Sequence, residues 1–122
     1  MGRTAEIKRH WDRVAALGCM VTGDKHNVTI HHCHGGSMKL RQVHRSAGRK
    51  TSDWLVIGLH HDLHLAPGIG IDASVRRPSV WEWEAVNGDQ AVMLDRVGAL
   101  LGLDLWALAF AEDKGMVPRR AA

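Results

Sequence analysis

Two clusters of histidine in the middle of the sequence contain the residue types that metal binding and proton transfer require. Residues 31–34 read HHCH, and residues 60–64 read HHDLH. Imidazole binds divalent metals in its neutral form and gains or loses a proton near pH 7. The two clusters therefore indicate a metal site, a general base, or both.

The secondary structure predicted around these clusters would bring them together. Residues 28–32 are rich in β-branched side chains and predict a strand, and the apolar run 54–59 predicts a second strand. Residues 60–66 predict a short helix. Neighbouring residues on a strand point to opposite faces, so either His31 or His32 is expected to face the site, and the spacing does not decide which.

The second cluster places two histidines on one face of the predicted short helix. His60 and His64 are four residues apart, a spacing at which two imidazoles bind one zinc ion in zinc proteases. Those enzymes also need a glutamate directly after the first histidine, where this sequence has His61. A zinc protease is therefore excluded.

The remaining segments predict helices around a small sheet. Residues 19–21 predict a short strand that forms a hairpin with residues 28–32. Apolar residues at spacings of three and four predict helices over 7–17, 80–86, 91–101 and 105–110. We expect one α+β domain over residues 1–122, with its core at about 19–66 and a helical C-terminal part at about 78–112.

Charge is distributed unevenly along the chain. No Asp or Glu occurs between Lys25 and Ser52, whereas acidic residues dominate between Trp81 and Asp113. A basic central segment beside an acidic C-terminal region indicates either a surface that binds a polyanion, usually nucleic acid, or a solvated loop that happens to be basic. The side chains expected to contact DNA are Lys39, Arg41, Arg45, Arg49 and Lys50.

Together these features meet the needs of phosphodiester hydrolysis. A divalent cation neutralises the phosphate, a base near pH 7 activates water, and basic side chains hold the backbone. The N-terminal segment is too charged for a secretory signal, and no apolar run approaches the roughly 20 residues that span a bilayer. We therefore expect a cytoplasmic protein without a membrane partner.

Several of these motifs occur together in a known family. The stretches HHCHGG, GRKTSDWLVIGLHHDLH, GIGID and WEWEAVNGDQ resemble HNH nucleases of the phage recombination-enhancement (Ref-like), RecA-dependent type. The resemblance runs from about Trp11 to Leu103. It implies a ββα-metal (HNH) core, a DNA substrate that is single-stranded or coated by recombinase, a RecA-type partner, and a phage or prophage gene expressed in a bacterial host.

The resemblance also implies roles for individual residues. His32 would be the general base, and His31 and His64 would bind the catalytic metal, although the roles of His31 and His32 could be exchanged. Asp72 lies near the position of a further histidine in many relatives and would be a weak third ligand or merely a loop acid. Apart from the resemblance, His60 is a candidate for a further metal ligand, for a residue that supports the ligands or contacts phosphate, or for a surface residue.

This sequence departs from the family at two points. Many relatives bind a structural zinc through two ligand pairs, but here only Cys19 and His60 remain of the four ligands, so we expect that zinc to be absent. The middle asparagine of the HNH motif is not evident, and Ser52 or Asp53 lies near its place. These departures leave fine catalytic geometry open.

The main functional prediction is a divalent-metal-dependent DNA endonuclease of the HNH type, with Mg²⁺ or Mn²⁺ as the expected metal and Zn²⁺ or Ni²⁺ as alternatives. The second is an HNH-fold DNA-binding accessory module without turnover. A third is a metal-storage or metal-sensing protein, which the histidine content permits but the charge distribution does not explain. The oligomeric state is not predicted.

Overall fold

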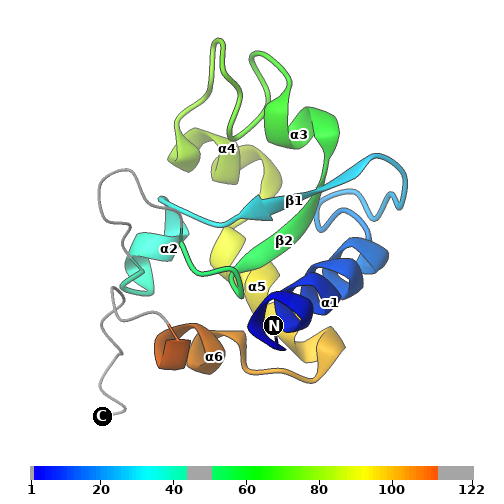
Figure 1. The fold of residues 1–122 in the computed structure, drawn as a ribbon. Helices are drawn as coiled ribbons and strands as arrows, with labels where there is room; N and C mark the ends of the chain where they lie inside the picture. Colours follow the sequence, from blue (N-terminus) through cyan, green and yellow to red (C-terminus); the bar gives the residue numbers. More distant parts are fainter. Residues whose placement is uncertain (1, 44–50, 113–122) are drawn as a thin grey trace.

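The centre of the fold is a sheet of two antiparallel strands, seen in a computed structural model that describes residues 2–43 and 51–112 (Figure 1). Strand β1 (Val28–His32) pairs with β2 (Val56–His60), and His31 lies opposite Ile57. Helix α3 (His61–Leu65) begins directly after β2. The predicted order of two strands and a short helix is therefore present.

Helices surround this sheet. They are α1 (Gly2–Leu17), α2 (Ser37–Leu40), α4 (Val80–Asn87), α5 (Gln90–Leu101) and α6 (Leu105–Glu112). Helix α1 packs against both strands, α5 packs against β2, and α6 packs against α5. Figure 1 shows α3 and α4 together at one end of the molecule and α6 at the other.

Strand β2 is enclosed on both faces, which explains its sequence. Val56, Ile57, Gly58 and Leu59 are all buried, and Val14 of α1 and Leu94 of α5 are fully buried in the same core. A strand covered on both faces carries a continuous apolar run instead of an alternating one. Strand β2 was therefore predictable from its sequence.

The predicted hairpin between residues 19–21 and 28–32 is wrong. Residues 20–22 form a turn, closed by bonds from Cys19 N to the Asp24 carbonyl (2.8 Å) and from Gly23 N to the Cys19 carbonyl (2.8 Å). The partner of β1 is β2, across the intervening segment 33–55. Residues 19–21 are apolar because Cys19 and Met20 are buried in the core, which the pattern could not distinguish from strand pairing.

The structure confirms the α+β class and the helical C-terminal part. Helix α4 begins with a capping box, in which Ser79 Oγ accepts from Glu82 N and Glu82 accepts from Ser79 N. Asp104 caps α6 through Ala107 N (3.1 Å). Asp89 is the N-cap residue of α5 but makes no side-chain capping bond. None of the described helices combines the length and the hydropathy needed to cross a bilayer.

Candidate metal centre

Three side chains from separate elements meet beside the sheet. His31 comes from β1, His64 from α3, and Asp72 from the loop that follows α3. Asp72 Oδ2 lies 3.1 Å from His31 Nδ1 and 3.1 Å from His64 Nε2. One donor atom from each residue lies within 4.8 Å of the other two. We call these three residues the ligand triad.

The loop that carries Asp72 lies directly on the backbone of α3. Ile71 N donates to the Leu63 carbonyl (2.9 Å), and Asp72 N donates to the His64 carbonyl (2.8 Å). Only glycine fits at residue 70, because a Cβ there would lie 2.6 Å from Leu65 N. This close approach places the Asp72 carboxylate beside the His64 ring.

Gln90 determines which nitrogen of His31 carries a proton. The Gln90 amide nitrogen donates to the His34 carbonyl (2.8 Å) and to Glu84 Oε2 (3.1 Å), so its oxygen must be the atom 2.9 Å from His31 Nε2. That oxygen can only accept, so His31 Nε2 carries the hydrogen. In neutral His31, the Nδ1 lone pair therefore points toward Asp72.

Thr29 determines the tautomer of His64 in the same way. The Thr29 hydroxyl donates to the Leu59 carbonyl (3.0 Å) and so accepts from His64 Nδ1, 2.8 Å away. The proton of neutral His64 is then on Nδ1, and its Nε2 lone pair points toward Asp72 Oδ2. Two imidazole lone pairs and a carboxylate oxygen thus converge on one point, an arrangement that needs a cation between them.

The electrostatics favour a metal ion over a proton in this role. The His31 side chain is completely buried, and burial lowers the pKa of His31 despite the opposing effect of its bonds to Asp72 and Gln90. Burial alone would raise the pKa of Asp72, and hydrogen bonds donated by His31, His34 and His64 lower it far below its usual range. In the neutral tautomers, His31 Nδ1 and His64 Nε2 carry lone pairs and cannot donate these bonds. A metal ion between the two nitrogens and Asp72 Oδ2 would take the place of the missing protons and keep the carboxylate ionised beside a neutral His31.

A buried acid fixes Gln90 in turn. The Glu84 carboxylate accepts hydrogen bonds from Ser37 N (2.8 Å), Ser37 Oγ (2.6 Å) and the backbone N of Gln90 (2.9 Å). It also accepts the bond from the Gln90 side-chain amide described above. Gly36, with φ of +48°, leaves no room for a Cβ against this carboxylate. These bonds connect α2, α4 and α5, so the position of Gln90 beside His31 is set by the packing of three helices.

His34 is a third histidine at the site and was not predicted there. Its Nε2 lies 2.7 Å from Asp72 Oδ1, the oxygen that faces away from the other two imidazoles. Its only sequence signal was membership of the first cluster. The roles of Thr29 and Gln90 were not predicted either. Thr29 is 35 residues from His64, and Gln90 is 59 residues from His31, so no local sequence signal connects them.

His32, the predicted base, contacts a different set of residues. Its Nε2 lies 2.8 Å from Asp53 Oδ1, and its ring meets the edge of Trp11 with centroids 5.5 Å apart. Trp11 Nε1 also donates to the Asp53 carbonyl (2.9 Å), which anchors the segment to α1. Asp53, near the expected place of the missing asparagine, is thus the partner of the predicted base.

The other predicted site residues lie apart from the ligand triad. His60 is the N-cap residue of α3 and accepts from Asp62 N. Lys39 on α2 is exposed, while Arg41 pairs with Asp95 and lies over the Trp106 ring, 5.0 Å from its centroid. The predicted DNA contacts Arg45, Arg49 and Lys50 fall outside the described residues.

Comparisons with known proteins do not extend this description. The chain matches no protein-family model, no curated protein and no solved structure. The arrangement of His31, His64 and Asp72 is accordingly the main structural evidence on function.

Proposed function

We propose that the protein is a metal-dependent endonuclease that hydrolyses phosphodiester bonds in DNA. In this proposal His31, His64 and Asp72 hold one divalent cation, and His32 is the general base. The observation that supports it best is the convergence of two imidazoles of fixed tautomer and a carboxylate oxygen on one point. A hydrogen bond at the other ring nitrogen, which fixes the orientation of the imidazole, is typical of metal-binding histidines.

The donor set fits a catalytic metal site. Three protein ligands leave coordination positions for water and substrate, whereas structural zinc sites are closed by four. Imidazole nitrogen suits Zn²⁺ or Ni²⁺, and carboxylate oxygen suits Mg²⁺ or Mn²⁺. Of the two metals that the sequence favours, Mn²⁺ is the transition metal and also binds imidazole, so it is tested first.

Each part of the site has a role in this reaction. The cation would neutralise charge on the phosphate and on the departing oxygen. Asp53 accepts from His32 Nε2 and so leaves Nδ1 to take a proton from water, as a carboxylate does for the base in a catalytic triad. Gln90 and Thr29 orient the two rings and fix the tautomers of neutral His31 and His64.

A second candidate is a DNA-binding accessory module without turnover. The observation in its favour is that His32 bonds to Asp53 and packs on Trp11, while no hydrogen bond of the described residues joins it to the ligand triad. A base held away from the metal would leave a fold that binds DNA and does not cut it.

A cleavage assay separates the two candidates. Purified protein is incubated with supercoiled and single-stranded DNA and Mn²⁺ or Mg²⁺, alone and with a RecA-type filament on the DNA. His32→Ala, Asp72→Asn and an EDTA sample are the controls. The nuclease proposal predicts cleavage that all three controls abolish. DNA binding without cleavage under every condition would support the accessory module.

A further inference from the structure

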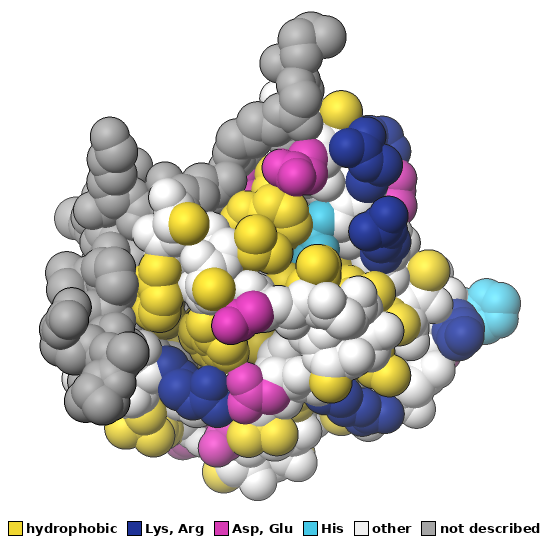
Figure 2. Space-filling view, turned by 90° about the horizontal axis from the view of Figure 1, so that it is seen from below, with side chains coloured by type: hydrophobic (Ala, Val, Ile, Leu, Met, Phe, Trp, Pro, Cys, Tyr) yellow, Lys and Arg dark blue, Asp and Glu magenta, His cyan; other side chains and the backbone are white. Residues whose placement is uncertain are grey.

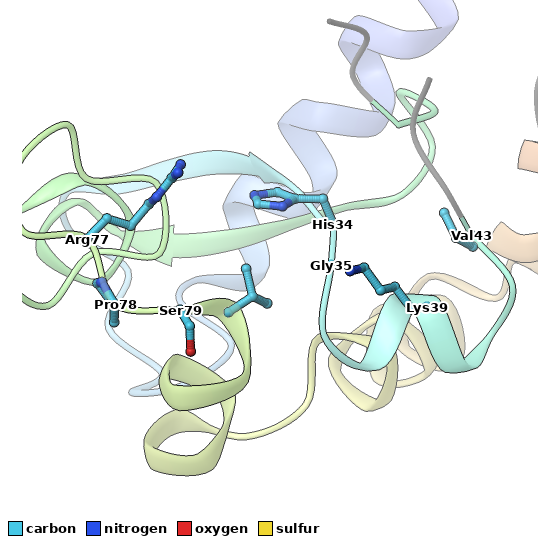
Figure 3. A pocket seen from close by; sticks show the side chains of 8 residues that line it. His34, Gly35, Lys39, Val43, Arg77, Pro78 and Ser79 are labelled. Atoms are coloured by element: carbon cyan, nitrogen blue, oxygen red, sulfur yellow. The ribbon is translucent and has the colours of Figure 1, made fainter. Parts of the chain in front are cut away.

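A cavity of about 390 Å³ opens next to the ligand triad. Its lining includes His34 and Gly35 after β1, Lys39 on α2, and Arg77 and Ser79 before α4. Figure 3 shows the His34 ring between the Arg77 side chain on one side and the Lys39 side chain on the other. The His34 ring also contacts Asp72 (2.7 Å), so the cavity and the metal centre share this residue.

The lining has one sign of charge. Lys39 and Arg77 come from segments far apart in the chain, and no Asp or Glu lines the cavity. Neither side chain forms an ion pair with another of the described residues, in contrast to Arg41, which pairs with Asp95. By comparison, Lys and Arg on the face in Figure 2 are dispersed among acidic and hydrophobic side chains.

This combination suits a phosphate group. The guanidinium of arginine presents a planar fork that matches phosphate oxygens, and lysine adds a compact charge. The volume is in the range of pockets that hold small organic molecules, roughly 300–1,000 Å³, so a nucleotide unit fits as well as its phosphate. The backbone conformation of Arg76, with φ of +51°, lies in the left-handed region just before Arg77.

We propose that this cavity binds a backbone phosphate of the nucleic-acid strand, next to the phosphate that lies at the metal centre. The inference rests on the proposed function and names Arg77, which the sequence did not indicate, as a substrate-binding residue together with Lys39. Because it contacts Asp72 and lines the cavity, His34 connects the two subsites.

The test is the salt dependence of DNA binding, measured by fluorescence anisotropy with a labelled single-stranded oligonucleotide in EDTA. The variants are Lys39→Ala, Arg77→Ala, their combination and Arg77→Lys. Arg96→Ala, an exposed α5 cation outside the cavity, is the matched control. Each lost phosphate contact should reduce the magnitude of the slope of log K against log salt by about 0.7, the value for single strands, and Arg96→Ala should not change it. Arg77→Lys should keep the slope and weaken binding, because it keeps the charge and loses the fork.

Three results would overturn the inference in different ways. An unchanged slope in the double variant would remove the cavity from the DNA interface, even if the protein cleaves DNA and the proposed function stands. Inorganic phosphate or a mononucleotide that competes as strongly as the oligonucleotide would indicate a small-molecule site. Wild-type protein that binds Mn²⁺ but neither binds nor cleaves DNA would overturn both proposals.

Mn²⁺ binding, measured by calorimetry on the same variants, tests whether the metal centre is intact. Lys39 and Arg77 are exposed and are not ligands, so we expect Mn²⁺ affinity to be unchanged in both alanine variants. A parallel loss of Mn²⁺ and DNA binding would show that the substitutions act through the metal centre, and this would contradict a separate phosphate subsite.

Discussion

Two adjacent histidines on β1 have opposite environments. The His31 side chain is completely buried among Asp72, His64 and Gln90, whereas the His32 side chain is 15% exposed and contacts Asp53 and Trp11. Because successive strand residues point to opposite faces, one strand supplies two chemically different imidazoles. In the proposed function the first is a metal ligand with a fixed lone pair, and the second is the general base with a carboxylate partner.

Asp72→Asn should have the largest effect, which is a loss of Mn²⁺ affinity on the His31 face of β1. The amide keeps the size of the carboxylate but removes the negative charge that faces His31 Nδ1 and His64 Nε2. We expect Mn²⁺ affinity to fall by more than about a hundredfold, which exceeds the effect of losing a group that only orients a ligand. Isothermal titration calorimetry measures it. Asp62→Asn, an exposed acid on α3, is the control, and equal affinity in both variants would refute Asp72 as a ligand.

His32→Ala should separate the two histidines. We expect the cleavage rate to fall by about 10²–10⁴-fold, the usual contribution of a general base, while Mn²⁺ affinity stays within about twofold of wild type. Single-turnover cleavage and calorimetry on the same sample measure both quantities. His31→Ala should instead lose both. If His32→Ala lost metal and His31→Ala kept it, the two roles would have to be exchanged.

Gln90→Met should have a smaller effect on Mn²⁺ affinity, because it changes only the hydrogen bond that orients His31. Methionine fills a similar volume, but its sulfur is only a weak acceptor for the hydrogen on His31 Nε2, so the imidazole tautomer is held less firmly. We expect Mn²⁺ affinity to fall about 10–100-fold. The lost bonds to Glu84 and to the His34 carbonyl should also lower the free energy of unfolding, by about 1–3 kcal/mol. Chemical denaturation and calorimetry measure the two effects separately.

Thr29→Val tests the equivalent hydrogen bond, which orients His64. Valine has nearly the shape of threonine but offers no acceptor to His64 Nδ1. We expect Mn²⁺ affinity about tenfold lower, and Thr29→Ser, which keeps the hydroxyl, should bind like wild type. Equal affinity of the valine and serine variants would show that the Thr29 hydroxyl does not orient His64.

His10 is a buried imidazole without a carboxylate partner, and it serves as a reference for His31. Its effect on the pH dependence of stability is the smallest that we predict. It lies against Trp54, its Nδ1 has no hydrogen-bond partner in the described structure, and burial lowers its pKa. Above pH 6.5 the folded and unfolded chains are both neutral at His10. Below it the unfolded chain takes up a proton first, so stability is lost as pH falls.

Denaturation between pH 7.5 and 5.5 measures this effect. His10→Gln removes the titrating group, so its stability should fall less steeply than that of wild type, by at most about 1.4 kcal/mol per pH unit. His26→Gln, at an exposed turn position, is the control and should follow wild type. Parallel curves for wild type and His10→Gln would mean that His10 titrates alike in both states.

The helices and strands with local causes were predictable from the sequence, but the long-range strand pairing was not. The continuous apolar run of β2 and the capping residues of α4 and α6 have local causes and were predictable. The partner of β1 was predicted wrongly because residues 19–21 are apolar for packing reasons that their own sequence does not express.

The site was predictable to a similar extent. His31 and His64 lie in visible clusters, and Asp72 was expected near them through the resemblance. The positions of Gln90 and Thr29 depend on how α5 and β1 pack in three dimensions, so their contacts with the histidines have no pattern in the chain. His34 was visible in its cluster, but its contact with Asp72 depends on the loop that crosses α3.

The most direct test of the central claim is an anomalous difference map from crystals grown with Mn²⁺. We expect one strong peak within bonding distance of His31 Nδ1, His64 Nε2 and Asp72 Oδ2, with His32 too far from it to be a ligand. A peak elsewhere in the chain, or no peak among these three atoms at saturating Mn²⁺, would contradict it.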